Sequence, residues 1–330
     1  MAAQFTFPAF RIHEDGARLE RLALDDLSPG EVVIRVQWSG INYKDALAAT
    51  GGRIVRRFPL VGGVDLSGVV ESSSDASLMP GDAVLVTGCG LSETRDGGYA
   101  GFARVPAEAV VKLPPQLSAR NAMAVGTAGF AAALAITQLE HNGLKPGNGP
   151  VVVTGATGGV GCVAIDMLAQ RGYEVVALTR KGEAAGFLRS LGAAEVLIGD
   201  AHGMGPKPLE AERWAGAIDN VGGELLGGLI RSTRSGGGVA AVGLAGGAEL
   251  YVSLMPFLLR GVNLLGVNSA ATRRDKRLAI WKRIASDLLP RHLDDIVTRV
   301  VPLEELPEAF AGYREGTIRG RTLVKVGVQP

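Results

Sequence analysis

The chain has 330 residues and a mass of 34.2 kDa, so we expect two domains, each large enough to bury its own core. Lys and Arg total 34 against 33 Asp and Glu, and this balance excludes the basic footprint of a nucleic-acid-binding protein. With only two cysteines, a disulfide scaffold and a structural zinc lobe of four cysteines are excluded as well.

The N-terminal half reads as a β-rich domain. Residues 1–16 lack the basic segment and long apolar stretch of a secretory signal, so we expect a cytoplasmic protein. From Glu31 to about Val111, short β-runs separated by turn residues lie at 31–40, 63–74, 81–90 and 99–114. This spacing predicts antiparallel pairing with few helices.

The pattern becomes Ala-rich and helical after Pro114-Pro115. Residues 121–139 carry no charge and are nominally long enough to span a membrane. Polar and small residues such as Gly126, Thr127 and Gln138 interrupt them, so we expect a buried helix of a soluble domain and no membrane partner.

Strands and helices then alternate, which predicts a parallel, doubly wound sheet. The expected strands are 151–156, 173–179, 195–200, 214–222, 237–245 and 262–269, with helical stretches such as 161–172 and 184–192 between them. A basic helix is expected at 272–289, and a last strand at 321–326 is expected to return to the first domain. The predicted fold class is therefore α/β, with a β-rich domain at 1–123, completed by 297–330, and a doubly wound domain at 124–296.

The first strand of this sheet runs into an A-x-G-x-x-G motif at 156–161, followed by an apolar helix. Gly158 would let the backbone approach a pyrophosphate, and Gly161 would let the helix pack closely on the strand. The helix N-terminus supplies N–H groups for an anion. The predicted dinucleotide-binding residues are Thr157, Gly158, Gly159 and Val160.

The second strand ends in Thr179-Arg180-Lys181, where an NAD-binding protein would carry an acid for the ribose hydroxyls. A hydroxyl and two cations suit a 2′-phosphate, so the predicted cofactor is NADPH. The alternative is that Arg180 and Lys181 are ordinary solvated loop charges.

Residues at the carboxyl ends of the later strands should line the cofactor crevice, because open α/β sheets bind ligands there. Those residues are Asn220, Leu244 and Asn268. Thr127 is expected to approach the nicotinamide, and Arg321 to reach the cofactor from the first domain. Each of these is alternatively an ordinary loop residue.

The β-rich first domain, the glycine loop and the C-terminal return strand resemble the medium-chain dehydrogenase/reductase superfamily, which implies a GroES-like domain and a Rossmann domain. Its zinc-dependent members carry ligands in G-I-C-H-T-D and G-H-E segments. Here the corresponding residues are Gly40-Ile41-Asn42-Tyr43-Lys44-Asp45 and Gly63-Val64-Asp65. Because Asn42 and Val64 replace two ligands, the resemblance implies the zinc-free quinone oxidoreductase branch, with no bound metal.

Within that branch the chain resembles the bacterial acryloyl-CoA reductase subfamily from residue 42 to residue 326. The matching phrases include NYKDALAATG, GTAGFAAAL, VVVTGATGGVG, MPFLLRGVNLLGV and GRTLVKV. Asn220 and the Arg180-Lys181 pair depart from the subfamily. The resemblance implies NADPH-dependent reduction of acryloyl-CoA to propanoyl-CoA by hydride transfer to the β-carbon. The alternatives are an NADPH:quinone or general enone oxidoreductase and a non-catalytic NADPH-binding protein.

The candidate catalytic residues are Tyr43 and Asn42. Tyr43 replaces an active-site residue of the zinc enzymes, and its phenol could position the nicotinamide and protonate the α-carbon of the substrate. Asn42 and Lys44 would orient neighbouring polar groups. Asp45 is expected to cap the following helix or to hold a nearby Lys or Arg. The alternative for Tyr43 is a packing role alone.

Two further interactions are expected. The candidate site for the phosphates of an acyl-CoA substrate is the basic group Arg53, Arg56 and Arg57. This group is alternatively a solvated face, and Arg273-Arg274-Lys276-Arg277 is a competing basic group.

The apolar last strand of the doubly wound sheet, VNLLGV, is expected to pair with its copy across a two-fold axis, which predicts a homodimer.

Overall fold

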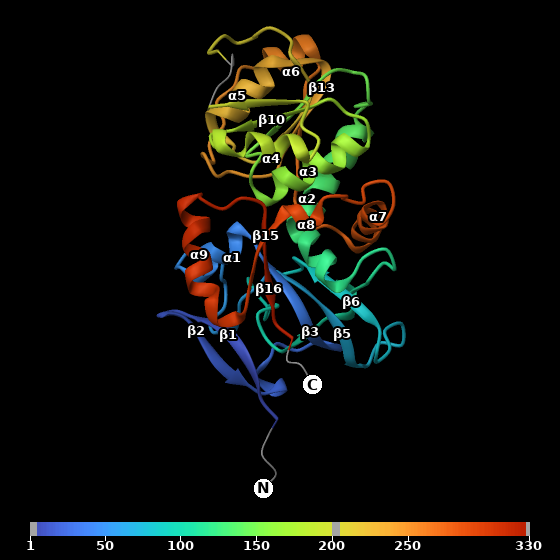
Figure 1. Cartoon of the computed structure of the whole chain (residues 1–330), viewed down its shortest axis with the longest axis vertical. Helices are drawn as coiled ribbons and strands as arrows, with labels where there is room; N and C mark the ends of the chain where they lie inside the picture. Colours follow the sequence, from blue (N-terminus) through green and yellow to red (C-terminus); the bar gives the residue numbers. More distant parts are fainter. Residues whose placement is uncertain (1–4, 200–204, 328–330) are drawn as a thin grey trace. The chain divides into compact units, whose positions relative to one another are not determined.

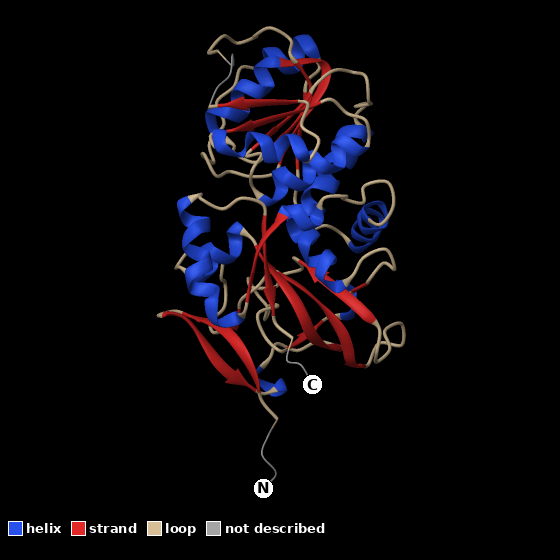
Figure 2. Cartoon of the chain, in the orientation of Figure 1, coloured by secondary structure: helices blue, strands red, loops and turns tan. Residues whose placement is uncertain are grey.

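The computed structural model describes residues 5–199 and 205–327. The chain forms two compact units. Unit 1 contains Met1–Thr127, Ala270–Ala279 and Leu293–Pro330, and unit 2 contains Ala128–Ser269 and Ile280–His292. Each unit has its own sheet system, drawn in Figures 1 and 2.

Unit 1 is the β-rich part of the chain. A small sheet has the order β2 (Gly16–Leu22), β1 (Phe7–His13), β4 (Leu60–Val61). The larger sheet has the order β15 (Val297–Val301), β16 (Arg321–Lys325), β3 (Val32–Ile41), β5 (Asp65–Ser73), β6 (Ala83–Thr87), β8 (Val111–Lys112), with β7 (Phe102–Val105) paired to β3. Apart from the parallel pair β15 and β16, the pairs are antiparallel. The predicted β-rich domain is confirmed, although the hairpin of β1 and β2 was not expected.

The helical elements of unit 1 are short. They are α1 (Tyr43–Ala49), the first part of α2 (Ala119–His141) up to Thr127, the beginning of α7 (Arg274–Ile284), α8 (Leu293–Ile296), α9 (Leu306–Glu315), and 3-10 turns at Leu24–Asp26, Ala107–Ala109 and Leu303–Glu305. Helix α1 packs against α9.

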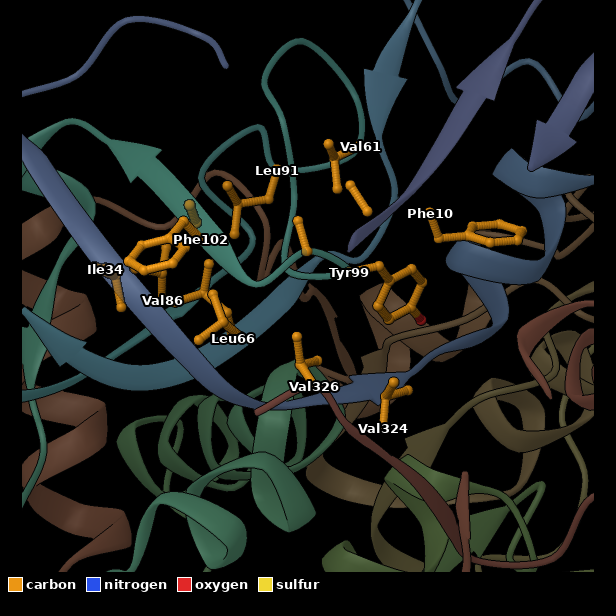
Figure 3. Close-up of a cluster of buried hydrophobic side chains, with 14 of the residues drawn as sticks. Phe10, Ile34, Val61, Leu66, Val86, Leu91, Tyr99, Phe102, Val324 and Val326 are labelled. Carbon is orange, nitrogen blue, oxygen red and sulfur yellow. The ribbon is translucent and has the colours of Figure 1, made fainter. Parts of the chain in front are cut away.

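The core of unit 1 follows from the two-residue period of its strands. In β3, Val32, Ile34 and Val36 are buried while Arg35 is exposed. Figure 3 shows Ile34 in the same cluster as Val324 of the C-terminal strand β16. Because Val324 pairs with Ser39 of β3, the end of the chain completes the sheet formed by its first third.

Helix α2 (Ala119–His141) is a core helix, as its composition predicted. Among the described residues it is the helix long and apolar enough to cross a membrane, by length and composition only, and 83% of its apolar window is buried. Gly126 interrupts it with φ 51 and ψ −160. The helix therefore has a sharp break just before Thr127.

Unit 2 is a doubly wound domain, as predicted. Its six parallel strands have the order β11 (Glu195–Ile198), β10 (Val175–Thr179), β9 (Val151–Thr154), β12 (Trp214–Asp219), β13 (Thr233–Ala241), β14 (Asn263–Gly266). Helices α3 (Gly159–Gln170), α4 (Ala185–Ser190), α5 (Gly223–Ser232) and α6 (Met255–Arg260) lie on its two sides (Figure 2), and a 3-10 turn spans Gly182–Ala184. The strand order reverses between β9 and β12, which is where such sheets bind ligands.

Two details of unit 2 differ from the expected strands. Strand β13 begins at Thr233, before the expected start at residue 237, because the run of glycines at 236–238 hid its first part. Asp200, the last residue of the expected third strand, lies outside the described residues.

The structure also places Ala270–Ala279 in unit 1, whereas the sequence analysis assigned this segment to the dinucleotide domain. Arg277 is 1% exposed and donates hydrogen bonds to the carbonyl oxygens of Thr87, at 2.6 Å, and Ala270, at 3.2 Å. Arg274 donates to the carbonyl oxygen of Val110 at 3.0 Å. These two cations hold the start of α7 in unit 1 and are not available as a phosphate-binding group.

Candidate functional site

In unit 2 the glycine loop connects β9 to α3. Gly155 has φ 56, and Gly158 is the N-cap residue of α3. A Cβ atom on Gly161 would lie 2.5 Å from the carbonyl oxygen of Gly155 and 2.7 Å from the Cα atom of Ala156. The helix can therefore start directly over the loop only with glycine at position 161, and its first N–H groups lie at the carboxyl end of β9.

Asn220 lies beside this loop, just after β12. Its backbone N–H donates to the Thr154 hydroxyl at 2.9 Å, and its Nδ2 donates to the Thr154 carbonyl oxygen at 2.7 Å. The Thr154 hydroxyl in turn donates to Asp219 at 2.6 Å. Among the described residues, the buried Oδ1 atom of Asn220 has no hydrogen-bond partner. A buried acceptor without a donor is costly, so this atom fits a ligand that supplies the donor.

The loops after β12 and β13 lie backbone to backbone next to Asn220. A Cβ atom on Gly243 would lie 2.4 Å from the carbonyl oxygen of Asn220, and one on Gly222 would lie 2.5 Å from the carbonyl oxygen of Gly247. Leu244 extends from this contact with 64% of its surface exposed. Asn268 follows β14, the far edge of the sheet, and is exposed as well.

The carboxyl end of β10 holds the predicted phosphate-binding residues. Thr179 is buried, and its hydroxyl oxygen accepts a hydrogen bond from the backbone N–H of Lys181 at 3.0 Å. Arg180 is exposed and Lys181 is half-buried. A cation thus stands where an acid would hold ribose hydroxyls, and the donor set of unit 2 fits a dinucleotide with a 2′-phosphate.

In unit 1, Asn42 is the N-cap residue of α1 and Tyr43 is its first residue. The backbone N–H of Asn42 donates to Asp45 Oδ2 at 2.8 Å, which confirms the expected capping role of Asp45. Tyr43 is 47% exposed, so its phenol is accessible on the surface of this unit. Lys44 forms an ion pair with Glu93 and has no contact with Asn42 among the described interactions.

Asp65 connects the predicted residues, although it was not itself among the residues predicted from the sequence. Its carboxylate is fully buried and accepts hydrogen bonds from Asn42 Nδ2, at 2.8 Å, from the Thr127 backbone N–H, at 3.0 Å, and from the Thr127 hydroxyl, at 2.5 Å. Arg321 Nη2 lies 3.8 Å from Asp65. The acid in the Gly63-Val64-Asp65 segment, aligned with G-H-E, is the signal that would have selected it.

Arg321, predicted to reach the cofactor, makes its hydrogen bonds within unit 1. It is 2% exposed and donates to Asn42 Oδ1, at 2.9 Å, and to the carbonyl oxygen of Ile41, at 3.1 Å. It also donates to the carbonyl oxygens of Ala124 and Met123. The guanidinium is therefore inside unit 1, where it acts on Asn42. Asn42, Thr127 and Arg321 come together around Asp65, and Tyr43 follows Asn42 directly.

The three arginines proposed for CoA fall into two groups. Arg57 donates to the Ser28 hydroxyl at 2.8 Å and lies 3.6 Å from the buried Asp96, so its guanidinium already has partners within unit 1. Arg53 and Arg56 are exposed in the loop that follows α1. In the described part of the chain, no group of three or more His, Cys, Asp and Glu residues is arranged to hold a metal ion.

The chain is similar to known dehydrogenases and reductases along most of its length. Residues 28–115 match the alcohol dehydrogenase GroES-like domain, and residues 159–286 match the zinc-binding dehydrogenase family. The acrylyl-CoA reductase AcuI of Ruegeria pomeroyi is 48% identical, over 94% of each chain. YhfP of Bacillus subtilis, provisionally named a quinone oxidoreductase, is 47% identical over 93% of this chain and 94% of its own.

Two solved structures are similar over nearly the whole chain. YhfP with NAD bound has a TM-score of 0.94 and 45% identity, and the match covers 98% of this chain and 100% of YhfP. YhdH of Escherichia coli with NADPH bound has a TM-score of 0.93 and 41% identity, covering 97% of this chain and 100% of YhdH.

Proposed function

The chain belongs to the medium-chain dehydrogenase/reductase superfamily, in the group that contains AcuI and YhfP, and from this premise we propose that it is an NADPH-dependent acryloyl-CoA reductase that works without zinc. The observation that carries the proposal is the 48% identity to AcuI over 94% of both chains. The α/β fold, with a GroES-like domain and a Rossmann domain, is consistent with this proposal.

We propose that NADPH binds at the carboxyl edge of the sheet in unit 2. The backbone N–H groups of Thr157, Gly158, Gly159 and Val160 would hold the pyrophosphate, and Thr179, Arg180 and Lys181 the 2′-phosphate. Asn220, Leu244 and Asn268 would line the nicotinamide end. The unpaired buried Oδ1 of Asn220 supports this assignment, as does the NADPH bound to YhdH. Because YhfP carries NAD, NADH is the competing cofactor.

The reaction adds a hydride to the β-carbon and a proton to the α-carbon of the thioester, and negative charge develops on the thioester oxygen between the two steps. When bound, NADPH supplies the hydride. Tyr43 supplies the proton or positions the nicotinamide, because its phenol is a donor that remains accessible on unit 1. The Asn42 amide donates to Asp65 through Nδ2 and accepts from Arg321 through Oδ1, so the backbone that presents Tyr43 keeps one orientation.

Recognition of the CoA phosphates is assigned to Arg53 and Arg56, which are exposed after α1. Arg57 is assigned to folding, since Ser28 and Asp96 already engage its guanidinium. Replacing Arg53 and Arg56 with Ala should raise the KM for acryloyl-CoA and leave the KM for a small enone unchanged. Equal changes for both substrates would refute the assignment.

The deciding experiment measures oxidation of NADPH and of NADH by chelator-treated protein with acryloyl-CoA, crotonyl-CoA and a simple quinone. Rapid turnover that requires NADPH and acryloyl-CoA supports the proposal. Faster turnover of the quinone would favour a quinone oxidoreductase, the second candidate, which the 47% identity to YhfP supports. Tight NADPH binding without turnover of any acceptor would favour a binding protein.

We also propose a cytoplasmic homodimer that pairs through β14. This strand is at the edge of its sheet, and an edge strand carries unpaired backbone groups. The strand and the segment that precedes it in the sequence carry exposed apolar side chains, namely Tyr251, Leu254, Met255, Leu258, Leu259 and Leu264. The low cysteine content supports the reducing compartment. A monomer in light scattering at working concentration would reject the dimer.

A further inference from the structure

The amide of Asn42 bridges two buried carboxyl groups. Its Nδ2 atom donates to Asp65 Oδ2 at 2.8 Å and lies 3.3 Å from Asp45 Oδ2, also as a donor. Its Oδ1 atom accepts from Arg321 at 2.9 Å. The orientation of this side chain is therefore set by three charged or titratable groups from α1, β5 and β16.

These three groups do not balance in charge. Asp45, Asp65 and Arg321 are 1%, 0% and 2% exposed, so one guanidinium faces two carboxyl groups away from water. The other titratable groups that face Asp45 are the phenols of Tyr99 and Tyr313, and burial raises the pKa of both phenols. A second buried negative charge would have no cation, and such a charge is removed by taking up a proton.

Asp45 is the group that takes up the proton. Asp65 has the Thr127 hydroxyl and N–H and the nearby Arg321, whereas Asp45 accepts only from N–H groups, those of Asn42 and of Val64, the latter at 2.9 Å. Burial, followed by repulsion from Asp65, raises the pKa of Asp45 to about 7. A proton on Asp45 near neutral pH removes the second buried negative charge.

We propose that Asp45 is a positioning residue, and that its protonation sets how firmly Asn42, and with it the start of helix α1 at Tyr43, is held. With a proton on Asp45, the Asn42 amide donates to Asp65 without competition from a second carboxylate. With both carboxyls ionised, two carboxylates attract the same NH2 group, and their repulsion loosens the arrangement. The role in catalysis rests on the proposed function, whereas the coupling of Asn42 to the pair does not.

The sign of the effect follows from linkage. The folded chain keeps a proton on Asp45 between about pH 4 and about pH 7, a range in which the unfolded chain has released it. Unfolding therefore releases up to one proton, and the stability falls as the pH rises through this range and levels off above about pH 7.

The test uses the whole chain without substrate or cofactor. We expect the side-chain amide resonance of Asn42 to move with a midpoint of about pH 7, together with loss of the infrared carbonyl band of a protonated carboxyl group. Asp45→Asn should abolish both changes. Asp75→Asn is the matched control, because hydrogen bonds from Ser77 lower the pKa of Asp75 and it does not titrate near neutral pH.

The proposal is overturned if the side-chain amide resonance of Asn42 in the wild-type chain does not move between about pH 5 and about pH 9. This measurement tests the proposal even if the Asp45→Asn variant fails to fold. A kinetic readout separates positioning from folding: the kcat should fall above about pH 7 while the Kd for NADPH stays constant. If the amide titrates but no acceptor is reduced, the proposed function fails and the coupling stands.

Discussion

Replacing Gly126 with Ala tests the arrangement around Asp65 most directly. Gly126 has φ 51 and ψ −160, close to a region that essentially only glycine occupies, so an L-residue there costs about 1–3 kcal/mol. The added Cβ atom would lie 2.6 Å from Arg321 Nη2 and 2.7 Å from Asp65 Oδ2.

The crowding adds a second cost, because neither side chain can easily move. Arg321 is held by carbonyl oxygens and Asp65 by three donors, so the crowding should cost about a further 1–3 kcal/mol. The expected loss of unfolding free energy is therefore about 2–6 kcal/mol, against a typical total of about 5–15 kcal/mol.

Urea unfolding followed by tryptophan fluorescence measures this loss. Gly143→Ala is the matched control, because Gly143 has φ 96 and nothing lies within 4 Å of its added Cβ atom. In the control variant, backbone strain alone should lower the free energy of unfolding by about 1–2 kcal/mol. If Gly126→Ala loses no more than Gly143→Ala, the Cβ does not crowd Asp65 and Arg321, and the reasoning about this network is wrong.

Three shorter predictions follow from the other proposals. The double substitution Arg180→Ser and Lys181→Ala should raise the Kd for NADPH about 10- to 100-fold in fluorescence titrations, because a charge-assisted hydrogen bond contributes about 1.5–3 kcal/mol. The same substitutions should leave the Kd for NADH almost unchanged. Leu258→Glu, on the exposed apolar face of α6, should give a monomer in light scattering, whereas Val300→Glu, exposed in unit 1, should not. Tyr43→Phe should lower kcat about 100-fold and abolish the solvent isotope effect, and full kcat with an unchanged isotope effect contradicts the acid role.

The parts of the molecule that could be predicted from sequence are those with a local cause. The glycine loop at 156–161 is one, because the tight turn, the N-cap at Gly158 and the close packing at Gly161 involve neighbouring residues. The six strands of unit 2 are another, since each is a short apolar run between turns or helices. Where the local signal weakens, as in the glycines at 236–238, the predicted strand start is displaced.

The arrangement around Asp65 has no such local cause. Asn42, Asp65, Thr127 and Arg321 come from four distant segments, and their hydrogen bonds cross between 23 and 279 residues of sequence. A charged residue has the same identity in the sequence whether it is exposed or buried among carbonyl oxygens. For this reason Arg321 was predicted to reach the cofactor and Arg277 was grouped with neighbouring cations, although the fold buries both guanidinium groups.

The buried carboxyl groups of Asp45 and Asp65 matter more than the exposed phenol of Tyr43 for the order of the site. Tyr43 is half exposed and is the first residue of α1, so its direction depends on how the start of α1 is held. That start is held by Asn42, whose amide is held by Asp65, Asp45 and Arg321 in turn. A change in the charge of Asp45 or Asp65 therefore reaches Tyr43 through the Asn42 side chain. Substitutions at Asp45 or Asp65 should alter the reaction although both carboxyl groups are buried.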